Sequence, residues 1–172
     1  MTPLALFTAS IQDESTSKLQ PGHLMRRTFY FAAVLTLITA CSHTVDTSVN
    51  PEFLSPNGPS ANPFSPAVRV GSLLFLAGQI GTNAGGQLVA GGLQAEVRQT
   101  LNNISEVLQK TGSSLDKVVK CTVFMADMKE WAAMNEIYAT YFRNHKPARS
   151  SFGTTGLAMN ARVEIECIAV VN

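Results

Sequence analysis

The chain has few charged residues and few of the residue types from which most catalytic and metal sites are built. Of its 172 residues only 15% are Asp, Glu, Lys or Arg, and the formal net charge is +1. Soluble domains carry charge on roughly a quarter of their residues. A near-neutral chain without a basic cluster gives no support to nucleic-acid binding, because phosphates are neutralised by an excess of Lys and Arg. The length is that of one domain, or of one domain with a tail.

Cysteine and histidine are also scarce. Three cysteines are too few for a small domain held together by disulfides, and no Cys-x-x-Cys or Cys/His spacing typical of zinc is present. His145 is expected at a helix end, where an imidazole caps carbonyls more often than it catalyses. His23 and His43 precede the regularly patterned region. P-loop, Rossmann, nucleophile-elbow and HExxH motifs are absent too, so we expect no metal, no cofactor and no Ser–His or Cys–His triad.

We interpret residues 1–40 as a leader. Arg26 and Arg27 precede an uncharged apolar run of about ten residues, the length of the central part of a secretory signal and too short for a transmembrane helix. The run ends in small residues before Cys41, an order that resembles the lipobox of bacterial lipoproteins. We therefore predict a signal at 25–40, cleavage before Cys41 and lipidation of its thiol. The alternative is a short buried helix or strand of a globular domain.

Residues 1–24 fit poorly in front of such a signal, since they contain Asp13, Glu14 and Pro21 and show no clear periodicity. We interpret them as the result of a start codon assigned too far upstream, and we predict that translation begins at Met25. The predicted location is the cell envelope, on the periplasmic side, with the lipid on Cys41 as the sole membrane contact. In a bacterium with two membranes the pattern favours the outer one. If the signal is not used, a cytoplasmic location is expected.

Residues 41–61 are predicted to be a flexible tether. They are rich in Ser, Thr, Asn and Pro, and such a stretch buries too little apolar surface to offset the entropy lost on ordering. The folded domain is predicted to occupy residues 62–172.

Regular patterning begins within that domain. Strands are predicted at 67–70, 73–77, 118–126, 150–154 and 162–171, with a short edge strand at 87–89. Gly71-Ser72 is a hairpin turn signal between the first two strands. Residues 93–110 carry apolar side chains at three- and four-residue steps, which predicts a helix. A second helix is predicted from Asp127, with Glu130 completing a capping box.

This order, ββ(β)αβαββ, predicts an α+β fold with a single mixed β-sheet of about six strands packed on two helices. Two helices cover one face of such a sheet. Val, Ile and Phe lie on both faces of the long strands, so we expect the second face to pack against another copy of the chain.

Cys121 and Cys167 both lie in the middle of predicted strands. We interpret them as buried apolar thiols. A disulfide between them in an oxidising compartment is the alternative, which the sequence does not decide.

Arg149, Glu164 and Glu166 stand out among the charged residues. Arg149 lies where a loop enters a strand. Glu164 and Glu166 are two apart in the most apolar strand and therefore share a face. Carboxylates in such surroundings need a partner or a function. From these residues alone, an Arg149–Glu164 ion pair at a subunit interface or two solvated charges are favoured over a catalytic role.

Seven short segments, which follow one another in the family's order, resemble the RidA (YjgF) family. Together they cover nearly all of the domain. They are 62–67, 76–80, 98–104, 119–124, 134–138, 147–150 and 163–166. The resemblance implies a homotrimer of chorismate-mutase-like protomers with a site in each cleft between neighbours. It also implies hydrolysis of reactive 2-imino acids and enamines, such as 2-aminoacrylate and 2-iminopropanoate, to 2-keto acids and ammonia, without a cofactor.

The resemblance also implies roles for individual residues. Arg149 would bind the substrate carboxylate through its planar fork of N–H donors. Glu164 would orient a water toward the imine carbon and accept its proton. The positions that correspond to substrate-binding residues are Phe64, Gly78, Asn135 and the backbone of Ser151.

The chain departs from the family's pattern at several of these places. Phe64 stands where Tyr is usual, which removes a hydroxyl. Ser151 stands where Cys is frequent, and Ala158 where Pro is common. The alternative function is a non-catalytic trimeric module that binds small carboxylates or keto acids in the envelope through Arg149.

Overall fold

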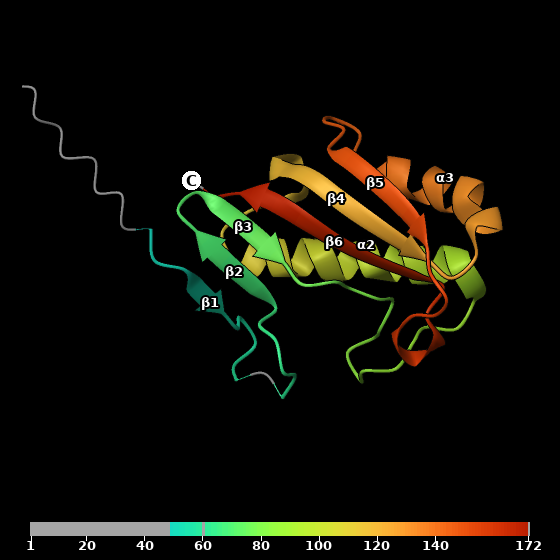
Figure 1. Cartoon of the computed structure of the whole chain (residues 1–172), viewed down its shortest axis with the longest axis horizontal. Coiled ribbons are helices and arrows are strands. Elements are labelled where there is room, and N and C mark those ends of the chain that lie inside the picture. The colour runs from blue at the N-terminus through green and yellow to red at the C-terminus, as the bar shows by residue number, and fades with distance from the viewer. Residues whose placement is uncertain (1–48, 60, 172) are drawn as a thin grey trace, which may run out of the picture. The chain divides into compact units, whose positions relative to one another are not determined.

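The structure, a computed structural model, describes residues 49–59 and 61–171 (Figure 1). The leader at 1–40, the lipidation of Cys41 and the first part of the expected tether lie outside these residues. Within the described ranges, no helix has the length and apolar character needed to span a membrane.

Six strands form one sheet in the order β1-β2-β3-β6-β4-β5. They are β1 (Glu52–Leu54), β2 (Ala67–Val70), β3 (Leu73–Leu76), β4 (Val118–Met125), β5 (Ala148–Gly153) and β6 (Val163–Val170). The β4–β5 pair is parallel and the other neighbours are antiparallel. Gly71 makes the β2–β3 turn at φ 59°, a left-handed conformation that favours glycine. The predicted single mixed sheet is confirmed.

Two α-helices pack on one face of this sheet. Helix α2 (Gly92–Lys110) crosses behind β6 and β3 in Figure 1, and α3 (Trp131–Tyr141) lies beside β5. The apolar stripe predicted for α2 is buried against the sheet, together with alternate side chains of the two central strands. The buried residues of these elements include Val97, Leu101, Ile104, Leu108, Cys121, Val123, Ile165 and Cys167.

The strand that the pattern placed at 87–89 is not formed, apart from a single bridge between Thr82 and Leu88. The sixth strand is instead β1, which pairs with β2 and carries a Glu52–Arg69 ion pair at 3.5 Å. This corrects the expected tether at 41–61, because an ordered strand lies inside that range. Three residues are too few to show a strand period, so the sequence pattern missed β1.

The start of the second helix also differs from the prediction. A 3₁₀ turn, η3 (Met128–Glu130), precedes α3, and the Asp127 carboxylate accepts a hydrogen bond from the Lys129 backbone N–H at 2.9 Å. Glu130 does not complete a capping box. Its carboxylate instead accepts from the guanidinium of Arg162, with Nε to Oε2 at 3.0 Å. Two further 3₁₀ turns are η2 (Leu115–Lys117) and η4 (Ala158–Asn160).

Two side chains lie on faces that periodicity did not predict. Val119 is 46% exposed, because an irregularity in the β4–β6 register between Val118 and Lys120 breaks the alternation. Glu96 is a charged residue of α2, yet only 6% of it is exposed. Its carboxylate accepts a hydrogen bond from the backbone N–H of Arg162 at 2.8 Å, which satisfies both groups at the start of β6.

Cys121 and Cys167 form a disulfide, which corrects their interpretation as free buried thiols. They are direct partners across the antiparallel β4–β6 pair, with their Cα atoms 4.1 Å apart. Both residues are buried, so the bond lies inside the core between the two central strands.

Candidate functional site

The residues expected to form one site lie in two separate cavities. Asn135 and Arg149 line a cavity of about 510 Å³, which we call the arginine cavity. Phe64, Gly78 and Glu164 line another of about 490 Å³, the glutamate cavity. The first lies along α3 and the loop before β5, and the second lies between the loop that follows β3 and the loop that precedes β6.

Strand geometry separates the two charged residues within one protomer. Arg149 is the β5 partner of Cys121, whose side chain points into the core, so Arg149 lies on the helix-covered face of the sheet. Glu164 alternates with the buried Val163 and Ile165 along β6 and therefore lies on the open face. An Arg149–Glu164 ion pair within the protomer is excluded by this arrangement.

In the arginine cavity, the Arg149 guanidinium lies against two aromatic rings of α3. Its central carbon Cζ is 4.6 Å from the centre of the Tyr138 ring and 5.7 Å from that of Trp131. Burial raises the pKa of Tyr138 to about 12, an effect that the nearby charge of Arg149 only partly offsets. Tyr138 is therefore a neutral phenol at any physiological pH.

Ser151 lies two residues after Arg149 on the same strand and the same face, as the partner of Val123. It lines neither of the two cavities. Ser151 is therefore near Arg149 on strand β5, but it does not line the cavity that Arg149 lines.

In the glutamate cavity, the Glu164 carboxyl lies against the backbone of Gly78. A Cβ atom added to Gly78 would overlap that carboxyl group, which gives a physical reason for glycine at this predicted position. Gln79 next to it exchanges two backbone hydrogen bonds with Ile165, each 2.9 Å long. These contacts fix the loop after β3 against the strand that carries Glu164.

The surroundings of Glu164 disfavour its charged form. Burial raises its pKa above the ordinary value of 4.5, and the negative charge of Glu166 on the same face raises it further. A carboxyl group with a raised pKa in a cavity is a typical candidate for proton transfer.

Two large apolar side chains flank this carboxyl. Phe64 is 53% exposed, and Met159, which the sequence pattern did not single out, is 55% exposed. Both line the glutamate cavity. Met159 and Asn160 have φ angles of 58° and 59°, a left-handed conformation that costs non-glycine residues energy and is concentrated at functional sites.

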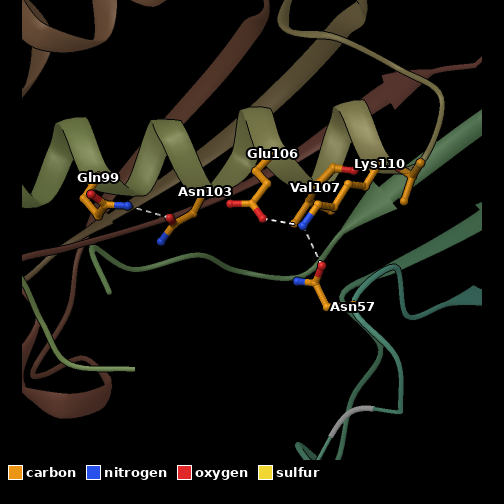
Figure 2. Close-up of polar contacts among 7 residues, drawn as sticks. Asn57, Gln99, Asn103, Glu106, Val107 and Lys110 are labelled. Carbon is orange, nitrogen blue, oxygen red and sulfur yellow. Dashed lines mark hydrogen bonds and ion pairs between the residues drawn. The ribbon is translucent and has the colours of Figure 1, made fainter. Parts of the chain in front are cut away.

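Polar side chains on α2 hold the loops around the glutamate cavity. Asn103 donates hydrogen bonds of 3.0 Å to the carbonyl oxygens of Ile80 and Thr82, and its own oxygen accepts from Gln99 at 2.8 Å. Figure 2 shows the Gln99–Asn103 contact beside a second set, in which Lys110 bridges Glu106 and Asn57. Helix α2 therefore fixes both the loop after β3 and the segment after β1.

The described part of the chain contains no cluster of His, Cys, Asp and Glu side chains that could hold a metal ion. The arginine cavity offers a cation for an anionic group, and the glutamate cavity offers a carboxyl group of raised pKa.

Most of the described chain matches a known protein family. The model of the family described as endoribonuclease L-PSP matches residues 56–171. The chain belongs to this family, which includes the RidA and YjgF proteins. A 2-iminobutanoate/2-iminopropanoate deaminase of Mus musculus is 44% identical over 109 residues, which are 63% of this chain and 81% of that protein.

Solved structures of the family share the fold. The yeast protein YEO7 is 37% identical with a TM-score of 0.67, covering 72% of this chain and 100% of that one. The YjgF gene product of E. coli is 31% identical with a TM-score of 0.63, covering 70% and 98%. The family match begins at residue 56, directly after β1 and before the predicted domain start.

The family resemblance singled out Arg149, Glu164 and Gly78, but not the side chains around them. Trp131 and Tyr138, whose rings contact Arg149, were not among the predicted site residues. The available signal was two aromatic residues about two turns apart on the helix that precedes the arginine.

Proposed function

We propose that this protein hydrolyses reactive 2-imino acids and their enamines to 2-keto acids and ammonia. The observation that carries the proposal is the presence, in one chain, of an arginine with no acidic partner among the described residues and of a carboxyl group of raised pKa, each lining a cavity. The deaminase names of relatives that are 40–44% identical support the same reaction.

Arg149 binds the substrate carboxylate in this proposal. Its planar guanidinium offers two parallel N–H donors that match the two oxygens of a carboxylate, a geometry that lysine does not reproduce. Binding through the carboxylate places the neighbouring imine carbon at a fixed distance from the guanidinium, so the reacting atom is positioned.

Glu164 activates the water. Its carboxylate accepts one proton of the water as the oxygen bonds to the imine carbon and the C=N double bond becomes single, and it passes this proton to the nitrogen. The carbinolamine then transfers its hydroxyl proton to the amino group through the same carboxylate, the carbon–nitrogen bond breaks, and ammonia leaves as the carbonyl of the keto acid forms. The raised pKa of Glu164 makes its ionised carboxylate a stronger base than an ordinary glutamate.

The active unit in this proposal is a homotrimer whose sites lie between protomers. Arg149 and Glu164 occupy different cavities on opposite faces of one sheet, so a site that uses both needs the arginine cavity of one protomer and the glutamate cavity of its neighbour. The exposure of Leu73, Phe75 and Phe152 on strands of the sheet supports an apolar contact between copies.

The family's description names a ribonuclease, but we favour the deaminase. The formal net charge is +1, and binding to a polyanionic backbone requires clustered cations. A reactive imino acid needs one carboxylate contact, which Arg149 supplies.

The test is hydrolysis of 2-iminobutanoate generated in situ, with the spontaneous rate subtracted. Arg149→Ala is expected to lower kcat/KM by roughly 10- to 100-fold, because a charge-assisted contact is lost. Arg143→Ala is the matched control, since that exposed arginine hydrogen-bonds only the Thr140 carbonyl among the described residues. Equal rates for Arg149→Ala and wild type would refute the assignment, and keto-acid binding without turnover would favour the binding module.

The proposal includes a membrane tether through a lipid on Cys41. Mass spectrometry of the full-length protein from a bacterial host is expected to show an N-terminal diacylglyceryl cysteine derived from Cys41. Cys41→Ala is expected to release the protein from the membrane fraction. An unprocessed wild-type chain in the cytosolic fraction would contradict the tether.

A further inference from the structure

We propose that Trp131 and Tyr138 are positioning residues whose aromatic rings hold the Arg149 guanidinium in place, so that its N–H edge remains available to a carboxylate. The identity of the carboxylate as a 2-imino or 2-keto acid rests on the proposed function. The arrangement of the three side chains does not.

The two rings belong to one face of one helix. Trp131 opens α3 and Tyr138 lies about two turns later, so both side chains project toward the same flank. The Arg149 Cζ lies 5.7 Å and 4.6 Å from their ring centres, within the range of a cation–π interaction. The parallel β4–β5 pairing fixes the backbone of Arg149 on this face.

The rings hold the guanidinium without neutralising it. A carboxylate in their place would occupy the N–H donors and cancel the charge, whereas a ring contributes only the negative face of its π-system. Among the described residues, no carboxylate lies within ion-pair distance of Arg149. The guanidinium therefore keeps both its charge and its donors for a ligand in the arginine cavity.

The Tyr138 ring is itself fixed. It packs on Phe142 with ring centres 4.6 Å apart, and only 7% of the residue is exposed. The hydroxyl of Tyr138 has no hydrogen-bond partner among the described residues. The ring face of Tyr138, rather than its hydroxyl, is thus the part that contacts Arg149.

Trp131 also provides a direct readout, because it is the chain's single tryptophan. A carboxylate that binds Arg149 changes the charge near the indole ring. Titration of the full-length wild-type protein with 2-oxobutanoate is expected to give a saturable change in tryptophan fluorescence. Arg149→Ala is expected to abolish the change, and Arg143→Ala is expected to leave it intact.

The decisive comparison is between ring-removing and ring-keeping variants. Trp131→Leu and Tyr138→Leu are expected to raise the KM for 2-iminobutanoate and the calorimetric Kd for 2-oxobutanoate by about 3- to 20-fold, with kcat changed less than twofold. Trp131→Phe and Tyr138→Phe are expected to recover most of the lost affinity. Trp131 is 39% exposed, so its variants test the proposal even if Tyr138→Leu fails to fold.

The outcomes separate this proposal from the proposed function. If wild type binds 2-oxobutanoate but does not turn over the imine, the deaminase assignment fails and the Kd series still tests the rings. An unchanged Kd in Trp131→Leu, or a Phe variant as weak as its Leu counterpart, would overturn the role of the rings. Absence of any 2-oxobutanoate binding by a wild-type protein that hydrolyses the imine would overturn the role of the rings and leave the deaminase assignment standing.

Discussion

Glu164 has a pKa above 4.5 for two reasons, first its partial burial and then the like charge of Glu166. A general base acts in its ionised form, so a raised pKa moves the loss of activity on acidification to higher pH. We expect kcat/KM for 2-iminobutanoate to fall as the pH drops through a value above 4.5. Glu164→Gln is expected to be slow at every pH and to lack this acidic limb.

Glu166→Gln provides the matched control for that profile. Removal of the like charge lowers the pKa of Glu164, so the acidic limb is expected to move to lower pH while activity at neutral pH persists. Rates are measured from pH 4 to pH 9 with the spontaneous hydrolysis subtracted at each point. An acidic limb that stays in place in Glu164→Gln would assign it to another group or to the substrate.

The positions of three single residues, Glu96, Val119 and Met159, could not be predicted from the sequence pattern. Glu96 lies in a helix whose other charged side chains are exposed, and only the fold reveals that the Arg162 backbone N–H needs its carboxylate. Val119 is exposed because of an irregular register, which no alternation pattern encodes. Met159 lines a cavity through a left-handed backbone conformation. In each case the deciding partner lies far away in sequence or the backbone departs from regular geometry.

At the scale of elements, the predictable parts are the long periodic ones. The apolar stripe of α2 spans about four turns, and the alternation of β6 spans eight residues. A single exceptional residue therefore does not obscure either period. Strand β1 has three residues and η3 has three, and neither length defines a period. The site residues Arg149 and Glu164 came from the family resemblance, whereas their placement in separate cavities follows from strand register.

The central β4–β6 pair is crosslinked by the Cys121–Cys167 disulfide, which closes a loop of 46 residues. Such a crosslink stabilises mainly by restricting the unfolded chain, typically by about 2–4 kcal/mol. We expect Cys121→Ala/Cys167→Ala to lose about that much free energy of unfolding in urea. Reductant is expected to lower the midpoint of wild type and to leave the double variant unchanged. Thiol labelling of both cysteines in unreduced, unfolded wild type would contradict the disulfide.

At the scale of the whole molecule, the sheet has one face covered by helices and one that bears exposed apolar residues. Phe124 and Phe152 stack on the open face with ring centres 6.3 Å apart, and Phe75 lies on the same face through the pairing of β3 with β6. An apolar sheet surface of this kind is typical of a contact with another protein surface. The proposed trimer would bury this surface and would also supply the neighbour that a site shared between the two cavities needs.

A site shared between protomers makes a prediction that a site within one protomer does not. Arg149→Ala and Glu164→Gln are each expected to be nearly inactive alone. In trimers assembled from a 1:1 mixture, a site whose arginine comes from the Glu164→Gln chain and whose glutamate comes from the Arg149→Ala chain is intact. Every mixed trimer contains one such site among its three, so it is expected to have about a third of wild-type activity. The two chains are co-expressed with different affinity tags, the doubly tagged trimers are purified, and their hydrolysis of 2-iminobutanoate is compared with that of each variant alone. Activity no higher than that of the single variants would show that Arg149 and Glu164 do not act together across an interface.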